Sequence, residues 1–393
     1  MPIECQAKWI DSVDGLAEVV AAIRATDRIA IDTEFHGERS YLPHLMLVQI
    51  ATHDAIFLVD PLGGLDIGVL FAAIAAHDAL VIGHALQNDL EIVALGHNIV
   101  FDRLFDTQIA ASFLGAGLQI GLSNLLRSEF DLRMPKGAQM ADWSRRPLPE
   151  RQLSYAADDV RYLLRLHTLF DGRLNELGRR AWVDEECAPL RRRDRYGRDP
   201  MACWQRVTGA RKLKSKEAGV LVELAAERER IAAEVNQVPH FLLSDEALLD
   251  MARHMPRKTE DLDGNRRTTQ RNVQRYADRW LAAVERGVDQ PFHVEPGRPP
   301  ALPGIEAVAN LIMLLVAEIS AREGIAAQLM LRRRQVLEAL QVGCPTHDAL
   351  CEALGLFGWR AELLEQPIWL LLDGQTQARV RCGDGDTLGV DFV

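Results

Sequence analysis

The stretch Arg28–Phe35 reads RIAIDTEF and places two carboxylates near the end of an apolar, strand-like segment. Side chains two positions apart in a strand lie on the same face, so Asp32 and Glu34 point the same way. Two like charges side by side repel, and burying them is costly unless a proton or a cation offsets the charge. A hard divalent ion bound by carboxylate oxygens is the remedy that this stretch favours. The alternative is an exposed edge strand with incidental acids.

The segments around this stretch follow the patterns of an α/β domain. The strand-like runs are 28–35, 44–52, 55–60 and 79–84, and helical spacing covers 12–25, 66–77 and 88–96. Strands that first follow one another and then alternate with helices are typical of a mixed sheet covered by helices. Asp106 or Thr107 is expected to cap a later helix. A loop over 133–149 is expected to precede one long helix over 150–177.

Two further places in this domain carry candidate site residues. Asp89 lies in the first turn of the helix that follows strand 79–84, and ligands of open α/β sheets bind at such strand ends. An acid in a first turn is also favourable for its interaction with the helix dipole alone. In the long predicted helix Tyr155 and Asp159 are four positions apart and share one face. Asp158 is turned away by about 100° and is not expected to join them.

Length and composition describe a multidomain globular protein. The chain has 393 residues, 48% of them hydrophobic and 26% charged, which predicts two or three domains. No apolar run approaches the roughly 20 residues of a membrane span, and the N-terminus lacks the pattern of a secretory signal. The six cysteines form no C-x-x-C pair. We therefore expect a cytoplasmic protein with free thiols and no membrane association.

The charge is unevenly distributed along the chain. The net charge of −11 argues mildly against a surface that grips nucleic acid everywhere. Residues 1–170 carry −9, residues 171–290 carry +3 and residues 291–393 carry −5. The acidity thus lies where metal ligands are expected, and the middle of the chain carries the cations.

The motifs in combination resemble a known enzyme family. D-x-E on a strand, an Asp after a later strand and Y-x-x-x-D on a helix resemble the DEDDy branch of the DEDD 3′-5′ exonuclease superfamily. IDTEF, HLMLVQI, DTQ, DWSRRPL and YAADDVRYLL together resemble the ribonuclease D family over residues 5–185. The segment that begins AGVLVELAAERERIAAEV is similar to the helical HRDC domain, which that family carries after its exonuclease core. Residues 305–372 resemble a second, more divergent copy.

The resemblance implies a domain order. It comprises a ribonuclease H-like α/β exonuclease domain with a mixed sheet (1–185), a basic linker (186–210), an HRDC-like helical domain (211–290), a proline-rich linker (291–303), a second HRDC-like domain (304–375) and a tail (376–393).

The resemblance also implies a mechanism and a substrate. Two divalent ions, Mg²⁺ or Mn²⁺, would be held by Asp32, Glu34, Asp89 and Asp159, with Tyr155 orienting the attacking water. The implied reaction removes nucleotides from the 3′ end of RNA and releases 5′-mononucleotides, with tRNA precursors as substrates. The sequence does not give the oligomeric state, and a monomer is favoured.

Several interpretations stay open at this stage. Lys136, Arg145 and Arg146 either contact substrate phosphates or belong to an ordinary solvated loop. A 3′-5′ DNA exonuclease is an alternative, because recognition of the 2′-hydroxyl depends on pocket contacts that spacing does not reveal. A second alternative is an inert nucleic-acid-binding adaptor, against which the five intact motif residues speak.

Overall fold

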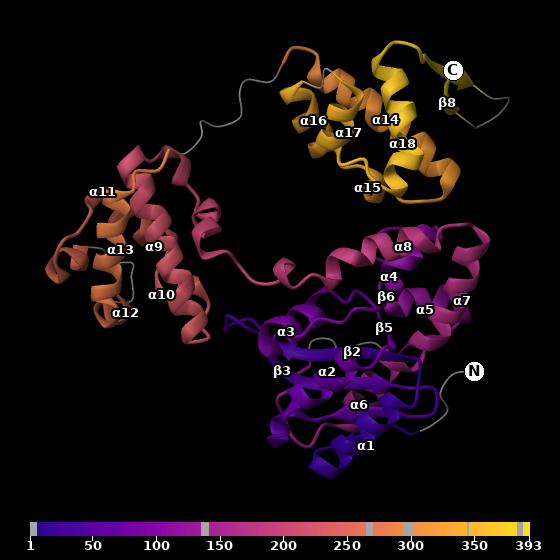
Figure 1. The fold of residues 1–393 in the computed structure, drawn as a ribbon, viewed down its shortest axis with the longest axis horizontal. Coiled ribbons are helices and arrows are strands. Elements are labelled where there is room, and N and C mark those ends of the chain that lie inside the picture. The colour runs from indigo at the N-terminus through magenta and orange to yellow at the C-terminus, as the bar shows by residue number, and fades with distance from the viewer. Residues whose placement is uncertain (1–5, 135–140, 265–269, 294–301, 344–345, 383–387) are drawn as a thin grey trace.

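The computed structural model describes the chain except residues 1–5, 135–140, 265–269, 294–301, 344–345 and 383–387. Figure 1 shows an N-terminal sheet covered by helices, followed by two helical units. The predicted fold class, a mixed α/β domain followed by helical domains, is confirmed. Among the described helices, none combines the length and the apolarity needed to cross a lipid bilayer.

The N-terminal sheet has six strands in the order β1-β4-β3-β2-β5-β6. The strands are β1 (Lys8–Ile10), β2 (Arg28–His36), β3 (His44–Ala51), β4 (Ile56–Val59), β5 (Leu80–Gly83) and β6 (Leu104–Asp106). β2 pairs antiparallel with β3 and parallel with β5, so the carboxylate-bearing strand is central. β1 and β6 were not expected from the sequence, because three-residue strands are too short to show a period.

Eight α-helices surround or follow this sheet in the described part of the first domain. They are α1 (Val13–Arg24), α2 (Ile67–Ala76), α3 (Gln87–His97), α4 (Thr107–Phe113), α5 (Leu122–Phe130), α6 (Glu150–Arg161), α7 (Leu163–Glu176) and α8 (Arg180–Cys187). The hydroxyl of Ser12 caps α1 by accepting a hydrogen bond from the backbone N–H of Gly15. Asp106 caps α4, as its sequence position indicated.

The prediction of one long helix over 150–177 was wrong. The helix is interrupted at Tyr162, whose backbone angles are φ −105° and ψ −7°. α6 packs against β2, β3 and β4, whereas α7 packs against β2, β5 and α4. Because a sheet twists from strand to strand, two shorter helices follow its surface where one straight helix would diverge from it.

α7 buries a histidine that has no polar partner. His167 is 6% exposed, its ring meets that of Phe105 edge-on at 4.6 Å, and neither ring nitrogen has a hydrogen-bond partner among the described residues. Burial lowers the pKa of His167 from 6.5 to about 4. The imidazole is therefore neutral in the folded chain at every pH above that value.

We expect the free energy of unfolding to fall as the pH drops from about 6.5 to about 4. In this range His167 becomes protonated in the unfolded chain but stays neutral in the folded chain. Over the whole window the loss is about 3 kcal/mol. Urea unfolding at several pH values would measure it. His167→Leu should lose this component, whereas His53→Asn, at an exposed site, should keep it. Equal pH dependence in all three proteins would contradict the assignment.

The second unit consists of helices and short 3-10 turns. Its helices are α9 (Ser215–Glu234), α10 (Pro239–Leu242), α11 (Asp245–His254), α12 (Gln270–Arg275) and α13 (Ala277–Asp289), with η6 (Thr259–Gly264) before α12. α9 and α13 pack closely at Gly219 and Gly287. A Cβ on Gly287 would lie 2.4 Å from the Cα of Val220, so only glycine permits this approach.

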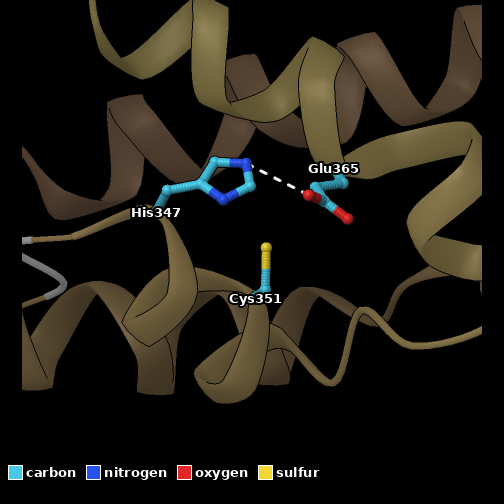
Figure 2. A group of neighbouring side chains, drawn as sticks. All are labelled: His347, Cys351 and Glu365. Carbon is cyan, nitrogen blue, oxygen red and sulfur yellow. Dashed lines mark ion pairs between the residues drawn. The ribbon is translucent and has the colours of Figure 1, made fainter.

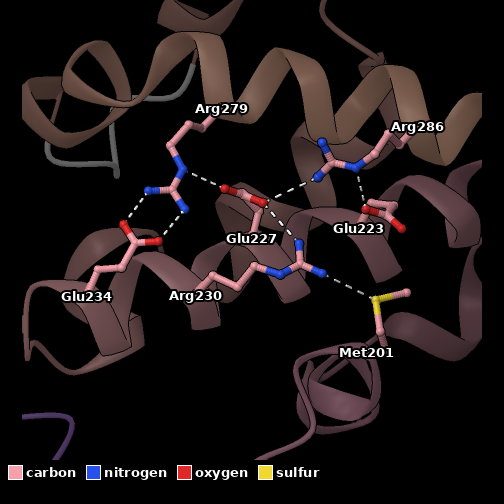
Figure 3. Close-up of polar contacts among 7 residues, drawn as sticks. All are labelled: Met201, Glu223, Glu227, Arg230, Glu234, Arg279 and Arg286. Carbon is pink, nitrogen blue, oxygen red and sulfur yellow. Dashed lines mark hydrogen bonds and ion pairs between the residues drawn. The ribbon is translucent and has the colours of Figure 1, made fainter.

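An arginine–glutamate network joins α9 to α13 (Figure 3). Glu227, which is 7% exposed, accepts hydrogen bonds from Arg230, Arg279 and Arg286. Arg279 also pairs with Glu234 through two hydrogen bonds. Several cations of the basic middle third are therefore neutralised within the domain. Fewer arginines of this region are therefore available to contact nucleic-acid phosphates than its net charge of +3 indicates.

The basic segment 186–210 is more structured than the linker that the sequence predicted. It contains the short 3-10 helices η2 (Ala188–Arg191), η3 (Arg193–Arg195) and η4 (Pro200–Arg206), with η5 (Ala210–Lys212) at its end. Arg193 and Arg195 bond to side chains of the first domain, Asn98 and Gln87. Its C-terminal half packs against α9 and buries Cys203. The sequence did not indicate this packing, because the apolar residues of the segment are scattered among many charged ones and show no helical or strand period.

The third unit consists of helices followed by a hairpin. It contains α14 (Ile305–Glu323), α15 (Ala327–Met330), α16 (Arg333–Val342), α17 (His347–Leu354), α18 (Trp359–Leu372), β7 (Ala378–Cys382) and β8 (Leu388–Phe392). α18 docks on the first domain through Trp359, whose ring stacks on Trp182 at 5.7 Å and meets Phe113 edge-on at 5.0 Å. Glu186 receives hydrogen bonds from Trp359 and Arg360. The core of this unit is thereby continuous with that of the first domain.

Candidate active site at the end of the central sheet

The topology of the sheet places β2 carboxylates at an open end. β2 pairs with β5 only as far as Ala30, opposite Ile82, and then continues to His36. Asp32 and Glu34 therefore lie past the end of β5. The pairing with β3 shifts register between Glu34 and Phe35. Such a bulge re-aims the side chains next to it, and bulges are frequent beside active sites.

Asp159 reaches the same place from α6, which packs against β2. Carboxylate oxygens of Asp32, Glu34 and Asp159 all lie within 4.8 Å of one another. Residues separated by more than a hundred positions in sequence thus share one small volume. Among the described residues, no lysine or arginine forms an ion pair with any of these three acids.

Asp89 lies beside this group rather than within it. It is 6% exposed in the first turn of α3, and it accepts a hydrogen bond from the hydroxyl of Thr33, which the sequence reasoning did not single out. The loop before α3 is held by Asp106, which accepts from the backbone N–H groups of Ala85 and Leu86 at 3.0 and 2.8 Å. Asp106 thus positions the turn that presents Asp89.

Burial raises the pKa values of all four acids, and charges within the group add to this at Asp32 and Glu34. Burial, together with the charges of Asp159 and Asp89, raises the pKa of Glu34 to about 9. Burial is also the main cause that raises the pKa of Asp159 to about 8 and that of Asp89 to about 7. The pKa of Asp32 is raised by burial and by the charges of the other three acids. The cluster therefore stores electrostatic repulsion that positive charge would relieve.

Tyr155 and Asp158 occupy different faces of α6, as their spacing predicted. Tyr155 hydrogen-bonds Asp159, which opposes the rise of that carboxyl's pKa, and its ring lies 6.1 Å from that of Trp143. Asp158 instead accepts a hydrogen bond from Arg161 at 2.8 Å. Tyr155 therefore contacts the carboxylate group directly, whereas Asp158 is paired with Arg161 and affects Asp159 only through its charge.

A cleft of about 500 Å³ opens from the carboxylates toward the second domain. Its lining includes Glu34, His36, Arg39, Trp143 and, from the second domain, Asn236. Asn236 also accepts a hydrogen bond from the backbone N–H of Leu42 at 2.7 Å, which ties the two domains at the cleft. Arg39 was missed in the sequence, because an isolated arginine in a loop carries no pattern.

The three basic residues named from the sequence have different fates. Lys136 lies outside the described residues. Arg145 is largely exposed, with a hydrogen bond to Asp142 at 3.1 Å. Arg146 instead donates two hydrogen bonds of 2.7 Å to Asp60 and others to backbone carbonyls. The N–H groups of its guanidinium donate hydrogen bonds within the domain, so we assign Arg146 a structural role and not a role in substrate binding.

The donor set fits hard divalent cations. The converging atoms are carboxylate oxygens, which Mg²⁺ and Mn²⁺ prefer over the nitrogen and sulfur ligands of softer metals. The mutual repulsion of the acids and the lack of a paired cation among the described residues point the same way. The arrangement can neutralise and orient a phosphodiester beside activated water.

Comparison with known proteins agrees with this geometry. Residues 7–175 match the family model described as 3′-5′ exonuclease, and residues 217–284 match that of the HRDC domain. Ribonuclease D of Sphingobium indicum is 35% identical over 377 residues, which cover 94% of this chain and 95% of that protein. Ribonuclease D of Zymomonas mobilis is 33% identical over 383 residues, 94% of each chain.

A solved structure extends the similarity to the whole fold. The crystal structure of Escherichia coli RNase D, described as an exoribonuclease involved in structured RNA processing, superposes with a TM-score of 0.77 at 29% identity. The match covers 95% of this chain and 100% of that one. Exonucleases of this type generally depend on divalent metal ions. The sequence identity, the two domain matches and the shared fold together show that this chain belongs to the ribonuclease D family of 3′-5′ exoribonucleases.

Proposed function

We propose that the chain trims the 3′ ends of tRNA precursors, using two divalent ions, Mg²⁺ or Mn²⁺, held by Asp32, Glu34, Asp89 and Asp159. The observation that carries this proposal is the convergence of three carboxylates within 4.8 Å beside buried Asp89. A monomer is proposed as the active species. The relatives' shared name, ribonuclease D, supports RNA over DNA.

The chain's own residues prepare the site for phosphodiester hydrolysis. When bound, the two ions would supply positive charge that favours deprotonation of a water and stabilises the leaving 3′ oxygen. Asp32, Glu34 and Asp159 would hold the ions from two elements, β2 and α6. Asp89, fixed by the hydroxyl of Thr33, would add a carboxylate from α3. Exposed Arg145 is proposed to contact phosphates of the strand that enters.

Tyr155 is proposed to orient the attacking water. A tyrosine with an ordinary pKa near 10 is a poor base at neutral pH, so positioning through its hydroxyl is the role that its hydrogen bond to Asp159 supports. Tyr155→Phe removes only the hydroxyl and keeps the ring beside Trp143.

We expect Tyr155→Phe to lower kcat about 10- to 100-fold with little change in KM, because the proposed role of the lost hydroxyl is to orient the reacting water and not to bind RNA. Steady-state kinetics on a short RNA would measure both constants. Tyr162→Phe, at the break between α6 and α7, serves as the matched control and should change neither. A rise in KM with unchanged kcat would contradict the assigned role.

The substrate is tested with a time course on a tRNA that carries a 3′ extension. Wild-type chain with Mg²⁺ should shorten it from the 3′ end to release 5′-mononucleotides, and excess chelator should stop the reaction. Matched RNA and DNA oligonucleotides in parallel test the sugar preference. Faster degradation of DNA would overturn the choice of RNA, and binding without shortening, with Mg²⁺ or Mn²⁺, would favour an adaptor.

A further inference from the structure

A second group of metal-ligating side chains lies in the third unit, away from the carboxylates of the first domain. His347 and Cys351 are four positions apart on α17 and so share one face of that helix. Glu365 faces them from α18. One ligand atom from each residue lies within 4.8 Å of the other two. Figure 2 shows the three side chains directed into the same space between the two helices.

The donor set differs from that of the exonuclease site. An imidazole nitrogen, a sulfur and a carboxylate oxygen are the three ligand types that zinc takes in proteins, whereas Mg²⁺ prefers oxygen alone. A nitrogen and an oxygen ligand on a tetrahedral zinc ion are separated by about 3.3–3.5 Å, given its bond lengths. The Nε2 atom of His347 and the Oε1 atom of Glu365 are 3.3 Å apart. This pair is already at the spacing of two ligands on one ion.

The surroundings hold the group in place. The ring of Trp369 meets the His347 ring edge-on at 5.1 Å and so restricts its rotation. Asp348 Oδ1 lies 3.6 Å from Nδ1 on a fully exposed side chain, too far for a hydrogen bond, so Nδ1 stays open to solvent-side partners. Cys351 is a free, partly buried thiol. Within the described residues His347 is the only ion-pair partner of Glu365.

We propose that His347, Cys351 and Glu365 bind one zinc-like divalent cation, with water in the remaining position, and that this cation clamps α17 to α18. α18 begins at Trp359, the residue whose ring docks on Trp182 and Phe113 of the first domain. A clamp on α18 therefore stabilises the helix that joins the third unit to the exonuclease domain. The role is structural and separate from hydrolysis.

The test titrates the full-length chain, freed of metal by dialysis against a chelator, with CoCl₂ in the presence of excess MgCl₂. We expect one equivalent of cobalt to produce a thiolate-to-cobalt charge-transfer band together with the visible bands of tetrahedral cobalt. The carboxylate site cannot produce the first band, because it contains no sulfur. Cys351→Ser should abolish this band, and His347→Gln should weaken cobalt binding at least about 10-fold.

Three control variants make the result specific. Cys203→Ser changes a buried thiol in the second unit, and Glu352→Gln changes the exposed neighbour of Cys351. Cys344→Ser changes a cysteine seven positions earlier in the sequence, outside the described residues. All three should keep the band. A wild-type chain without the band, a band that survives Cys351→Ser, or one that is lost only in Cys344→Ser would overturn the proposal.

Thermal unfolding gives a second readout. ZnCl₂ should raise the Tm of the wild-type chain and leave that of Cys351→Ser and His347→Gln unchanged, since a ligand that binds only the folded state stabilises it. If ZnCl₂ has no effect on the wild type while His347→Gln lowers Tm equally with and without zinc, the group is an ordinary ion pair and the proposal fails.

Discussion

Asp32→Asn is expected to abolish RNA shortening, with a rate loss on the order of 10³-fold or more, and at the same time to stabilise the metal-free chain. Activity falls because Asp32 has the central position in the proposed carboxylate group. Stability rises because burial and the charges of Glu34, Asp89 and Asp159 disfavour ionised Asp32 in the folded chain, whereas the unfolded chain ionises it freely at neutral pH; an amide carries no such cost. The expected gain is on the order of 1–2 kcal/mol, the free energy that corresponds to a difference of about one pKa unit between the folded and unfolded chains.

The predicted loss of activity combined with a gain of stability is specific to a site in which buried acids destabilise the metal-free chain. Thermal unfolding in chelator should give a higher Tm for Asp32→Asn than for wild type, and added MgCl₂ should raise the wild-type Tm more than that of the variant. A gel-based binding assay should show RNA affinity largely retained. A variant that both loses activity and unfolds more easily in chelator would contradict the proposed repulsion.

Asp158→Asn is the matched control, because it changes the neighbouring acid on the same helix. Asp158 is paired with Arg161 and is not among the carboxylates that converge with Asp32. Its replacement should keep most of the activity and should lower stability slightly by weakening that ion pair. If Asp158→Asn lost as much activity as Asp32→Asn, the assignment of faces on α6 would be wrong.

Arg146→Ala is expected to destabilise the chain by about 3 kcal/mol, because it leaves a buried carboxylate without its partner. The side chain of Asp60 is 7% exposed and that of Arg146 is 22% exposed. The same guanidinium bonds the backbone carbonyls of Met46 and Trp143. Urea unfolding would measure the loss, and RNA shortening should weaken in parallel since Trp143 packs on Tyr155.

The adjacent arginine supplies the control. Arg145 is 80% exposed at its side chain and pairs with Asp142 on the surface. Arg145→Ala should therefore change stability by less than about 0.5 kcal/mol. In Asp60→Asn/Arg146→Ala the combined loss should be smaller than the sum of the single losses, because the uncompensated charge is gone. Equal stability of Arg145→Ala and Arg146→Ala would show that the internal contacts of Arg146 contribute little.

Local periodicity explains why so much of the site was accessible from residue order. The two-residue period of a strand put Asp32 and Glu34 on one face, and the helical period separated Asp159 and Tyr155 from Asp158. Both arrangements hold in the structure. These relations involve neighbours along the chain, so they depend on backbone geometry alone and survive any arrangement of the domains.

Contacts between distant segments were decided by tertiary packing. The break at Tyr162 lets two helices follow a twisted sheet. The order of the strands in that sheet is not revealed by the sequence. Three contacts join residues from separate elements: Arg146 pairs with Asp60, Thr33 donates a hydrogen bond to Asp89, and Glu365 lies beside the ligand residues of α17. A side chain's chemistry is readable in isolation, but its partner is set by which surfaces the folded chain buries together.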